Sequence, residues 1–312
     1  MIVCKECGSE FSSERGLHCH LKQHGMTMAE YYTKHYPRTN KLTGDPLPFK
    51  NKSDYFSKDF STRAQLIKWC READTKEVSS YILKMLRERV KAKELSRAPC
   101  HIELRISELP DLDTYISHFG SYTSACNELG MAPLFGTRLP EGFFEEPVEE
   151  MRIFIDTREQ KPLSFKGSDS VKLDFGDYTA AGGDYSYTYV DRKSTNDFIG
   201  TLSLKNIDRF RAELQRARDL DSYVFIVIES DLNKIYKYNK WGPHSSNLKF
   251  IYHNMRVISH EFADTCQFVF TGDRENSEDI IPRILKFGKE IWNVDLQYYI
   301  DRYDMDSRKS RV

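Results

Sequence analysis

The sequence contains no apolar run that approaches the roughly 20 residues needed to cross a bilayer. Its first ten residues, MIVCKECGSE, also lack the apolar segment of a secretory signal. We therefore expect an intracellular protein, in bacterial or phage cytoplasm or in a nucleus, that is not secreted and has no membrane partner. Seven cysteines without such a signal argue against a disulfide framework and favour reduced thiols or a metal site.

Net charge is nearly absent as well, at −1 over 312 residues, but the charges are unevenly distributed. Residues 1–100 contain 19 Lys and Arg against 12 Asp and Glu, which leaves 27 bases and 35 acids in the remainder. A basic first third favours an anionic partner such as DNA. A solvated helical surface would give the same count. The length favours two domains.

Four residues near the start have the spacing of a zinc site. Cys4 and Cys7 form C-x2-C, and His20 and His24 follow as H-x3-H. Two thiolates on a turn and two imidazoles one helical turn apart can close a tetrahedral Zn²⁺ site. Residues 1–25 therefore resemble a two-Cys/two-His zinc finger over their whole length.

The other residues of this segment fit the same interpretation. Phe11 and Leu17 supply the apolar positions of a small ββα core, and Cys19 and His18 are flanking residues rather than ligands. Arg15, at the expected start of the helix, is the candidate contact to DNA. A single finger reads only about three base pairs, so a purely structural or protein-binding finger remains an alternative.

Residues 26–140 are expected to be mainly helical, because apolar residues recur at three- and four-residue steps. About residues 85–131 resemble the small DNA-binding repeat found beside HNH-type homing endonucleases. A plain helical linker domain is the alternative. The residues that carry the resemblance are Arg97, Pro99, Pro110, Tyr115, Phe119, Gly120, Ser121, Tyr122, Ala125 and Gly130.

The pattern changes after a proline-rich and acidic linker at 141–150. Short strand-like runs now alternate with helical stretches, and YVFIVIE is a continuous apolar run up to its final Glu, as expected for a strand covered on both faces. Residues 151–292 therefore predict an α/β domain with a mixed sheet and flanking helices. We expect residues 293–312 to form a C-terminal tail.

Acids gather around one predicted hairpin of this domain. If its turn is centred on GGDY, Asp177 lies opposite Val190, one residue away from Asp191. Asp191 and Lys193 project from the same strand face, and Asp156 ends the preceding strand. Clustered carboxylates repel unless a cation is present, and Mg²⁺ prefers such oxygen ligands. A surface hairpin with exposed ion pairs is the alternative.

Three segments in this order, FIDTREQ, LDFGDYT and YVDRKSTNDFIGTL, are similar to the nuclease motifs of XPF-type endonucleases. That family belongs to the restriction-endonuclease-like PD-(D/E)xK group. The resemblance implies that Asp156, Asp177 and Asp191 bind Mg²⁺ or Mn²⁺ and that Lys193 is the catalytic lysine. It implies supporting or phosphate-binding roles for Arg158, Glu159 and Arg192.

The resemblance has limits. Asp191 stands where the family has Glu. Because only about twenty residues follow residue 292 in this sequence, we do not expect the family's tandem helix-hairpin-helix module here, and the family's substrate preference and dimerisation are not carried over; a homodimer is compatible with the sequence. Asp197 is expected to be structural, and Arg209 to contact a phosphate. We expect a Mg²⁺-dependent DNA endonuclease targeted by its zinc finger and helical region. A catalytically silent DNA-binding protein and an RNA-processing nuclease are the alternatives.

Overall fold

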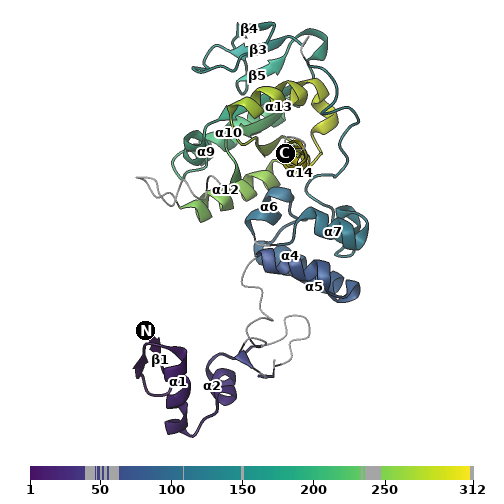
Figure 1. Cartoon of the computed structure of the whole chain (residues 1–312). Helices are drawn as coiled ribbons and strands as arrows, with labels where there is room; N and C mark the ends of the chain where they lie inside the picture. Colours follow the sequence, from purple (N-terminus) through teal and green to yellow (C-terminus); the bar gives the residue numbers. More distant parts are fainter. Residues whose placement is uncertain are drawn as a thin grey trace. The chain divides into compact units, whose positions relative to one another are not determined.

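The structure is a computed structural model (Figure 1). It describes residues 1–38, 63–107, 109–148, 151–232 and 247–309, together with the single positions 46, 48, 49, 51, 52, 55 and 235. The chain divides into two compact units, Met1–Met85 and Leu86–Val312, and each is described by itself. None of the helices in the described ranges is both long and apolar enough to traverse a bilayer.

The first unit begins with the expected ββα arrangement. Strand β1 (Ile2–Val3) pairs antiparallel with β2 (Glu10–Phe11), and helix α1 (Glu14–His20) follows. The Ser13 side chain accepts a hydrogen bond from the backbone N–H of Gly16 and so caps α1. The chain then tightens into the 3₁₀ helix η1 (Leu21–His24), which ends at the left-handed Gly25.

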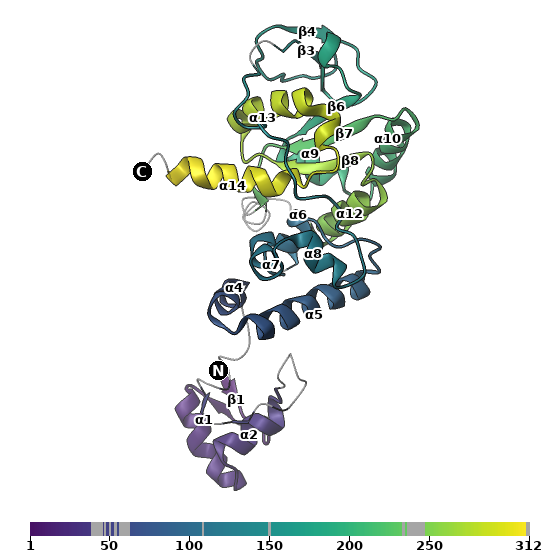
Figure 2. The same ribbon diagram turned by 90° about the vertical axis from the view of Figure 1, so that its right-hand side faces the viewer.

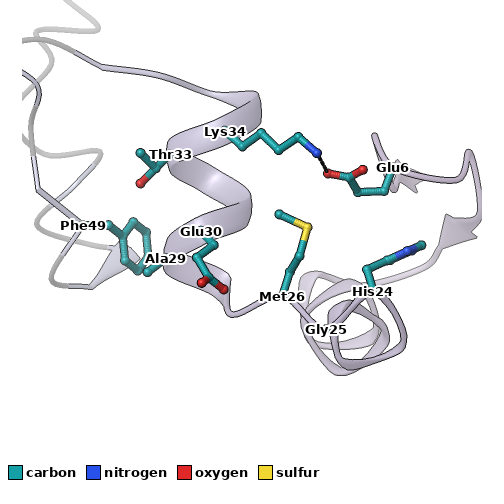
Figure 3. A pocket seen from close by; sticks show the side chains of 9 residues that line it. All are labelled: Glu6, His24, Gly25, Met26, Ala29, Glu30, Thr33, Lys34 and Phe49. Atoms are coloured by element: carbon teal, nitrogen blue, oxygen red, sulfur yellow. Dashed lines mark hydrogen bonds and ion pairs between the residues drawn. The ribbon is translucent and has the colours of Figure 1, made fainter.

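Helix α2 (Met28–His35) packs against the finger, so this small domain extends beyond residue 25. Tyr31 is fully buried, and its hydroxyl accepts a hydrogen bond from the backbone N–H of Lys5 at 2.9 Å. Lys34 reaches back to Glu6 at 2.6 Å, as Figure 3 shows. Helix α2 lies at the start of the region 26–140 that was expected to be mainly helical.

Two further helices follow, α4 (Arg63–Glu72) and α5 (Thr75–Lys93), with the rings of Trp69 and Tyr81 in edge contact. The division between the two units falls inside α5. In the second unit, Ile102 and Phe135 are buried in the same apolar cluster as the helices that cover the sheet.

The region that resembles a helical repeat contains α6 (His101–Ile106), α7 (Leu112–Phe119) and α8 (Tyr122–Asn127). Asp111 caps α7 and Ser121 caps α8. The Tyr122 hydroxyl donates to the carbonyl of Pro99 at 2.7 Å, which ties α8 to the chain before α6. The expected helical character is present, in short capped helices.

A six-stranded mixed sheet forms the centre of the second unit. Its strand order is β4-β3-β5-β6-β7-β8; β3–β5 and β5–β6 pair antiparallel and the other neighbours pair parallel. The expectation of a mixed sheet is thus confirmed. The strands are β3 (Ile153–Asp156), β4 (Ser168–Val171), β5 (Tyr178–Ala180), β6 (Thr188–Lys193), β7 (Tyr223–Ile228) and β8 (Cys266–Phe270).

Helices cover both faces of this sheet. In β7, Ile226 belongs to an apolar cluster with α9, α10 and α12, and Phe225 to a second cluster with α13 and α14. Figure 2 shows these two groups of helices on opposite sides of the strands. The helices are α9 (Thr195–Thr201), α10 (Ile207–Asp219), α12 (Leu248–Glu261), α13 (Arg274–Phe287) and α14 (Leu296–Lys309).

Two elements differ from the sequence prediction. The spacing of Leu204, Ile207 and Phe210 in LSLKNIDRFRAELQRARDL predicts one helix with these residues in its apolar stripe. A turn instead separates α9 from α10 and leaves Leu204 79% exposed. The Asn206 side chain donates to the carbonyl of Gly200 and fastens this turn. The predicted tail at 293–312 instead holds α14, whose Leu296 and Ile300 are buried in the core.

Candidate functional site

The hairpin brings the two central acids within electrostatic range of each other. Tyr178, the first residue of β5, pairs with Val190, one residue out from the predicted pairing, and Asp177 lies directly before the strand. The backbone N–H of Asp177 donates to the carbonyl of Val190 at 2.7 Å. Gly176 permits this approach, because its φ is +56° and a Cβ would lie 2.6 Å from the Val190 oxygen.

Asp177 and Asp191 form a repelling pair. Burial, followed by the negative charge of Asp191, raises the pKa of Asp177 from 3.8 to about 7. One Asp177 oxygen accepts the backbone N–H of Arg192 at 2.7 Å, which fixes its orientation toward β6. This paired arrangement favours a bound cation between the two carboxylates.

Lys193 completes this cluster from the same face of β6 as Asp191. Its Nζ lies 2.7 Å from Asp191 Oδ2 and 2.9 Å from Oδ1. Burial by itself disfavours the charged form, but the carboxylate of Asp191 outweighs it and raises the pKa of Lys193. Lys193 is therefore a cation at neutral pH. The structure thus brings together Asp177, Asp191 and Lys193 among the predicted residues.

Asp156 is placed differently. Its Oδ1 accepts the backbone N–H and Nε of Arg158, both at 2.7 Å, and its Oδ2 accepts Nη2 of Arg158 at 2.9 Å and the backbone N–H of Leu173 at 2.7 Å. A carboxylate offers about four lone-pair sites, so these donors occupy all of them. The Arg158 side chain and these backbone bonds hold the pKa of Asp156 low, at about 2. The Asp156 carboxylate therefore orients Arg158.

Arg158 itself remains accessible. Its side chain is 63% exposed although two of its nitrogens are bound to Asp156. The Asp177 charge is one of the influences that raise the pKa of Arg158, so the guanidinium lies within electrostatic range of the paired acids. Nη2 also donates to the carbonyl of Leu173 at 2.9 Å, so Nη1 is the guanidinium nitrogen suited to bind a phosphate oxygen.

Glu159 and Arg192 belong to a buried ion network beside the acids. Arg192 Nη2 lies 3.1 Å from Glu159 Oε1, and Nη1 lies 2.8 Å from Glu229 Oε2. Glu229 directly follows β7, and no sequence motif marked it as a site residue. Arg274, at the start of α13, lies 3.9 Å from Glu229 Oε1 and donates to the carbonyl of Pro162. The network joins β6, β7 and the loop after β3.

A second missed residue, Glu213, lies on α10. Burial and the charge of Asp191 raise the pKa of Glu213, and Lys193 partly offsets them. Its position three residues after the buried Phe210 places it beside the apolar stripe that faces the sheet. Arg209 lies one turn earlier on the same helix and is exposed, as a phosphate contact requires. Helical spacing from the stripe is the signal that identifies Glu213.

Asp197 has a structural position, as expected from its place after the lysine. Ser194 caps α9 by accepting the backbone N–H of Asp197, and its hydroxyl donates to the Asp197 carboxylate at 2.6 Å. The side chain is therefore engaged at the start of the helix that follows β6.

The acids of the second unit do not form a three-carboxylate metal cluster. In the described part of the chain, the only group of three or more His, Cys, Asp or Glu gathered closely enough for one metal ion is that of the finger. Asp177 and Asp191 nevertheless fit Mg²⁺, which is commonly held by one or two carboxylates together with waters and substrate phosphates.

The finger residues do gather as predicted. The donor atoms of Cys4, Cys7, His20 and His24 all lie within 4.8 Å of one another. Hydrogen bonds from the side chain and then the backbone of Ser9 lower the pKa of Cys7 to about 6, which favours the thiolate that zinc requires.

Comparisons with known proteins gave only distant structural similarities, two of which are described here. No protein-family model matches the chain, and no curated protein matches it. XPF from Aeropyrum pernix is similar at 17% identity over 45% of this chain and 68% of that chain, with a TM-score of 0.34. The same XPF in complex with DNA is similar at 17% identity over 45% of this chain and 66% of that chain, with a TM-score of 0.35. These similarities are weak, and we base no functional conclusion on them.

Proposed function

We propose that the protein is a metal-dependent endonuclease that hydrolyses phosphodiester bonds in DNA. The observation that carries this proposal is the juxtaposition of Asp177, directly before β5, and Asp191, on β6, with Lys193 bound to Asp191. Buried like charges of this kind are costly unless they serve a cation or a reaction. The XPF-like sequence motifs supply these same three residues.

Asp177 and Asp191 are the residues that would hold Mg²⁺ or Mn²⁺. Such an ion, when bound, polarises a phosphoryl oxygen and lowers the pKa of a bound water. Asp156 lies outside this ligand set in our proposal, because its lone pairs are already filled by Arg158 and Leu173. It acts on the substrate through Arg158.

The side chains around the pair have separate tasks. Lys193 holds its proton and offers N–H donors to the negative charge that develops on the scissile phosphate. Arg158 binds a neighbouring phosphate oxygen with the exposed end of its guanidinium. Glu159 and Glu229 hold Arg192, whose backbone N–H orients Asp177. In the hydrolysis, water oxygen bonds to phosphorus while the bond to one ester oxygen breaks and that oxygen gains a proton.

The first unit supplies DNA contacts in this proposal. A Zn²⁺ ion bound by the four finger ligands fixes α1, whose exposed Arg15 faces solvent near the helix start. The helical segments after the finger are the second candidate contact. These roles rest on the basic charge of residues 1–100 and on the two sequence resemblances.

A cleavage assay on a panel of labelled substrates tests the proposal. Duplex, flapped, forked and single-stranded DNA, with a matched RNA, are incubated with the full chain in Mg²⁺ and in EDTA. We expect DNA cleavage that requires Mg²⁺ and disappears in Asp177→Asn. DNA binding without cleavage would instead identify a silent binding protein, and preferential cleavage of the RNA would identify an RNA-processing nuclease.

A further inference from the structure

Helix α12 contains a buried arginine that has no acid of its own. Arg256 is only 9% exposed, and its Nη2 donates to Nδ1 of His253 at 2.7 Å. Among the described residues, no carboxylate forms an ion pair with Arg256, and its Nε and Nη1 form no hydrogen bond. Burial lowers the pKa of Arg256, and the charge of Glu103 only partly offsets that effect. A buried charge without a partner costs stability, so an anion that reached this guanidinium would be bound favourably.

The one acid beside this arginine is already engaged. Glu103, on α6, is 3% exposed, and its Oε1 accepts Nε and Nη2 of Arg89 at 3.2 and 3.1 Å. Its Oε2 lies 3.2 Å from Nε2 of His260 on α12. Glu103 therefore holds Arg89, in the last turns of α5, close to α12. The charge of Arg89 is one of the influences that lower the pKa of Arg256, so the two guanidinium groups lie within electrostatic range.

His253 and Lys93 add donors at the surface above Arg256. Because arginine can only donate, Nδ1 of His253 is the acceptor and Nε2 carries the ring proton. Both His253 and Lys93 are exposed, so these donors are open to solvent. Partial burial, followed by the charges of Arg256 and Lys93, lowers the pKa of His253 and favours its neutral form. We call Arg89, Lys93, His253 and Arg256 the α5–α12 cluster.

The helices that carry the cluster are rich in bases. Residues 86–93 of α5 contain four bases and one acid, and α12 contains two bases and one acid. The acid of α12 is Glu261, whose Oε2 accepts Nε of Arg211 at 3.1 Å. Even with Glu103 included, bases outnumber acids by six to three. The local charge therefore favours an anionic ligand.

The basic and imidazole side chains of α12 follow one face of the helix. Lys249, His253, Arg256 and His260 recur at steps of four, three and four residues, which places them one above the other. Eleven residues of helix correspond to about 16 Å. A single small anion would meet only part of such a stripe, whereas a nucleic-acid backbone presents phosphates along its length.

We propose that the α5–α12 cluster binds phosphate groups of a DNA backbone, at a site separate from Asp177 and Asp191. Arg256 offers its free guanidinium nitrogens at the base of the site, and His253 and Lys93 offer their N–H donors at its rim. Contacts of this kind position DNA without reading its sequence. The choice of DNA rests on the proposed function, and free phosphate, which has the same chemistry, is the other source that the experiment separates.

Duplex binding without metal tests the inference apart from catalysis. A fluorescein-labelled blunt duplex is titrated with the full chain in EDTA, by anisotropy, between about 50 and about 200 mM salt. The test variants are Arg256→Met, which keeps apolar volume in the buried site, and Lys93→Gln at the surface. Lys289→Gln is the matched control, since Lys289 is exposed just after α13, whose Phe287 packs on the opposite face of the sheet. Calorimetry with inorganic phosphate runs in parallel.

We expect Arg256→Met and Lys93→Gln each to bind the duplex about 10-fold more weakly than wild type. The slope of log affinity against log salt should fall by about 1 in each, and Lys289→Gln should match wild type. Arg256→Met should also resist urea at least as well as wild type, because it removes an uncompensated buried charge.

Equal duplex affinity in wild type and both test variants would overturn the inference. A less stable Arg256→Met with unchanged DNA affinity would assign Arg256 a structural role instead. Inorganic phosphate that binds wild type but not Arg256→Met, with duplex affinity unchanged, would identify a site for free phosphate and overturn the DNA assignment. Wild type that binds the duplex through this cluster but cuts no DNA in Mg²⁺ would refute only the nuclease proposal.

Discussion

Replacing Asp177 with Asn should stabilise the metal-free protein, and the gain should depend on pH. The pKa of Asp177 is raised from 3.8 to about 7, so the folded state keeps a proton that the unfolded state releases. Below about pH 4 both states are protonated and Asp177 has no effect on stability. Stability is then lost progressively as the pH rises from about 4 to about 7, because folding requires either an uptake of a proton or a buried charge.

The structure sets the size of this effect. At about 1.4 kcal/mol per pH unit, the interval between 3.8 and 7 corresponds to about 4 kcal/mol. Asn retains an oxygen that accepts the backbone N–H of Arg192, so the substitution removes the charge without orphaning that donor. Mg²⁺ should recover much of the loss in wild type and nothing in Asp177→Asn.

Hydrogen exchange of the β7 amides, measured in urea between pH 4.5 and 8, isolates the unit that holds the site. The free energy of opening should diverge between Asp177→Asn and wild type as the pH rises, and the curves should run parallel above about pH 8. Asp184→Asn removes one exposed charge from the same hairpin and is the matched control. A constant difference across this range, or a wild type more stable than Asp177→Asn at pH 8, would refute a repelling pair.

Three further predictions concern other parts of the chain. Asp156→Asn should retain Mg²⁺ affinity, measured by calorimetry, but lose about 2 kcal/mol of stability at neutral pH, because the pKa of Asp156 is lowered from 3.8 to about 2 in the folded state; a loss of metal binding in a folded variant would mean that Asp156 is a metal ligand. Zinc analysis should find about one ion per chain in wild type and Cys19→Ser and far less in Cys7→Ser, and equal contents would contradict the finger. Leu296→Ala should cost about 2–5 kcal/mol in thermal or urea unfolding, whereas a neutral result would mean that residues 293–312 are a tail.

Local patterns were predictable from the sequence wherever the chemistry depends on near neighbours. The spacing of Cys4, Cys7, His20 and His24 was enough to bring their donor atoms together, because one short turn and one helix position them. The apolar run that became β7 was equally clear, since each of its residues is buried. A mixed sheet with helices on both faces followed from the order of such segments.

The pairing register of the β5–β6 hairpin was predicted only to within one residue. The centre of a turn can be read from GGDY, but the length of the 3₁₀ segment η2 (Gly182–Asp184) and the left-handed Tyr187 shift the pairing by one residue. That shift places Tyr178 opposite Val190, where the sequence predicted Asp177. Only the folded turn contains this information.

Tertiary packing accounts for the remaining differences. Nothing near Asp156 in the sequence indicates that Leu173 would donate to its carboxylate, because that contact spans 17 residues and depends on the loop after β4. Residues 293–312 were predicted to form a tail for a similar reason. The apolar surface that Leu296 and Ile300 cover is formed by strands that are distant in the sequence. Glu229 forms its ion pair only in the folded chain, where Arg192 lies on the neighbouring strand.

The central claim is that Asp177, Asp191 and Lys193 form a phosphodiesterase site, and single-turnover cleavage of labelled DNA tests it most directly. Rates are compared for wild type, Lys193→Ala and Lys205→Ala, an exposed lysine in the turn before α10, at protein concentrations that saturate DNA binding. We predict that Lys205→Ala cleaves at the wild-type rate and that Lys193→Ala is slower by about 100-fold or more at equal DNA occupancy. Equal rates for the two lysine variants would contradict the account.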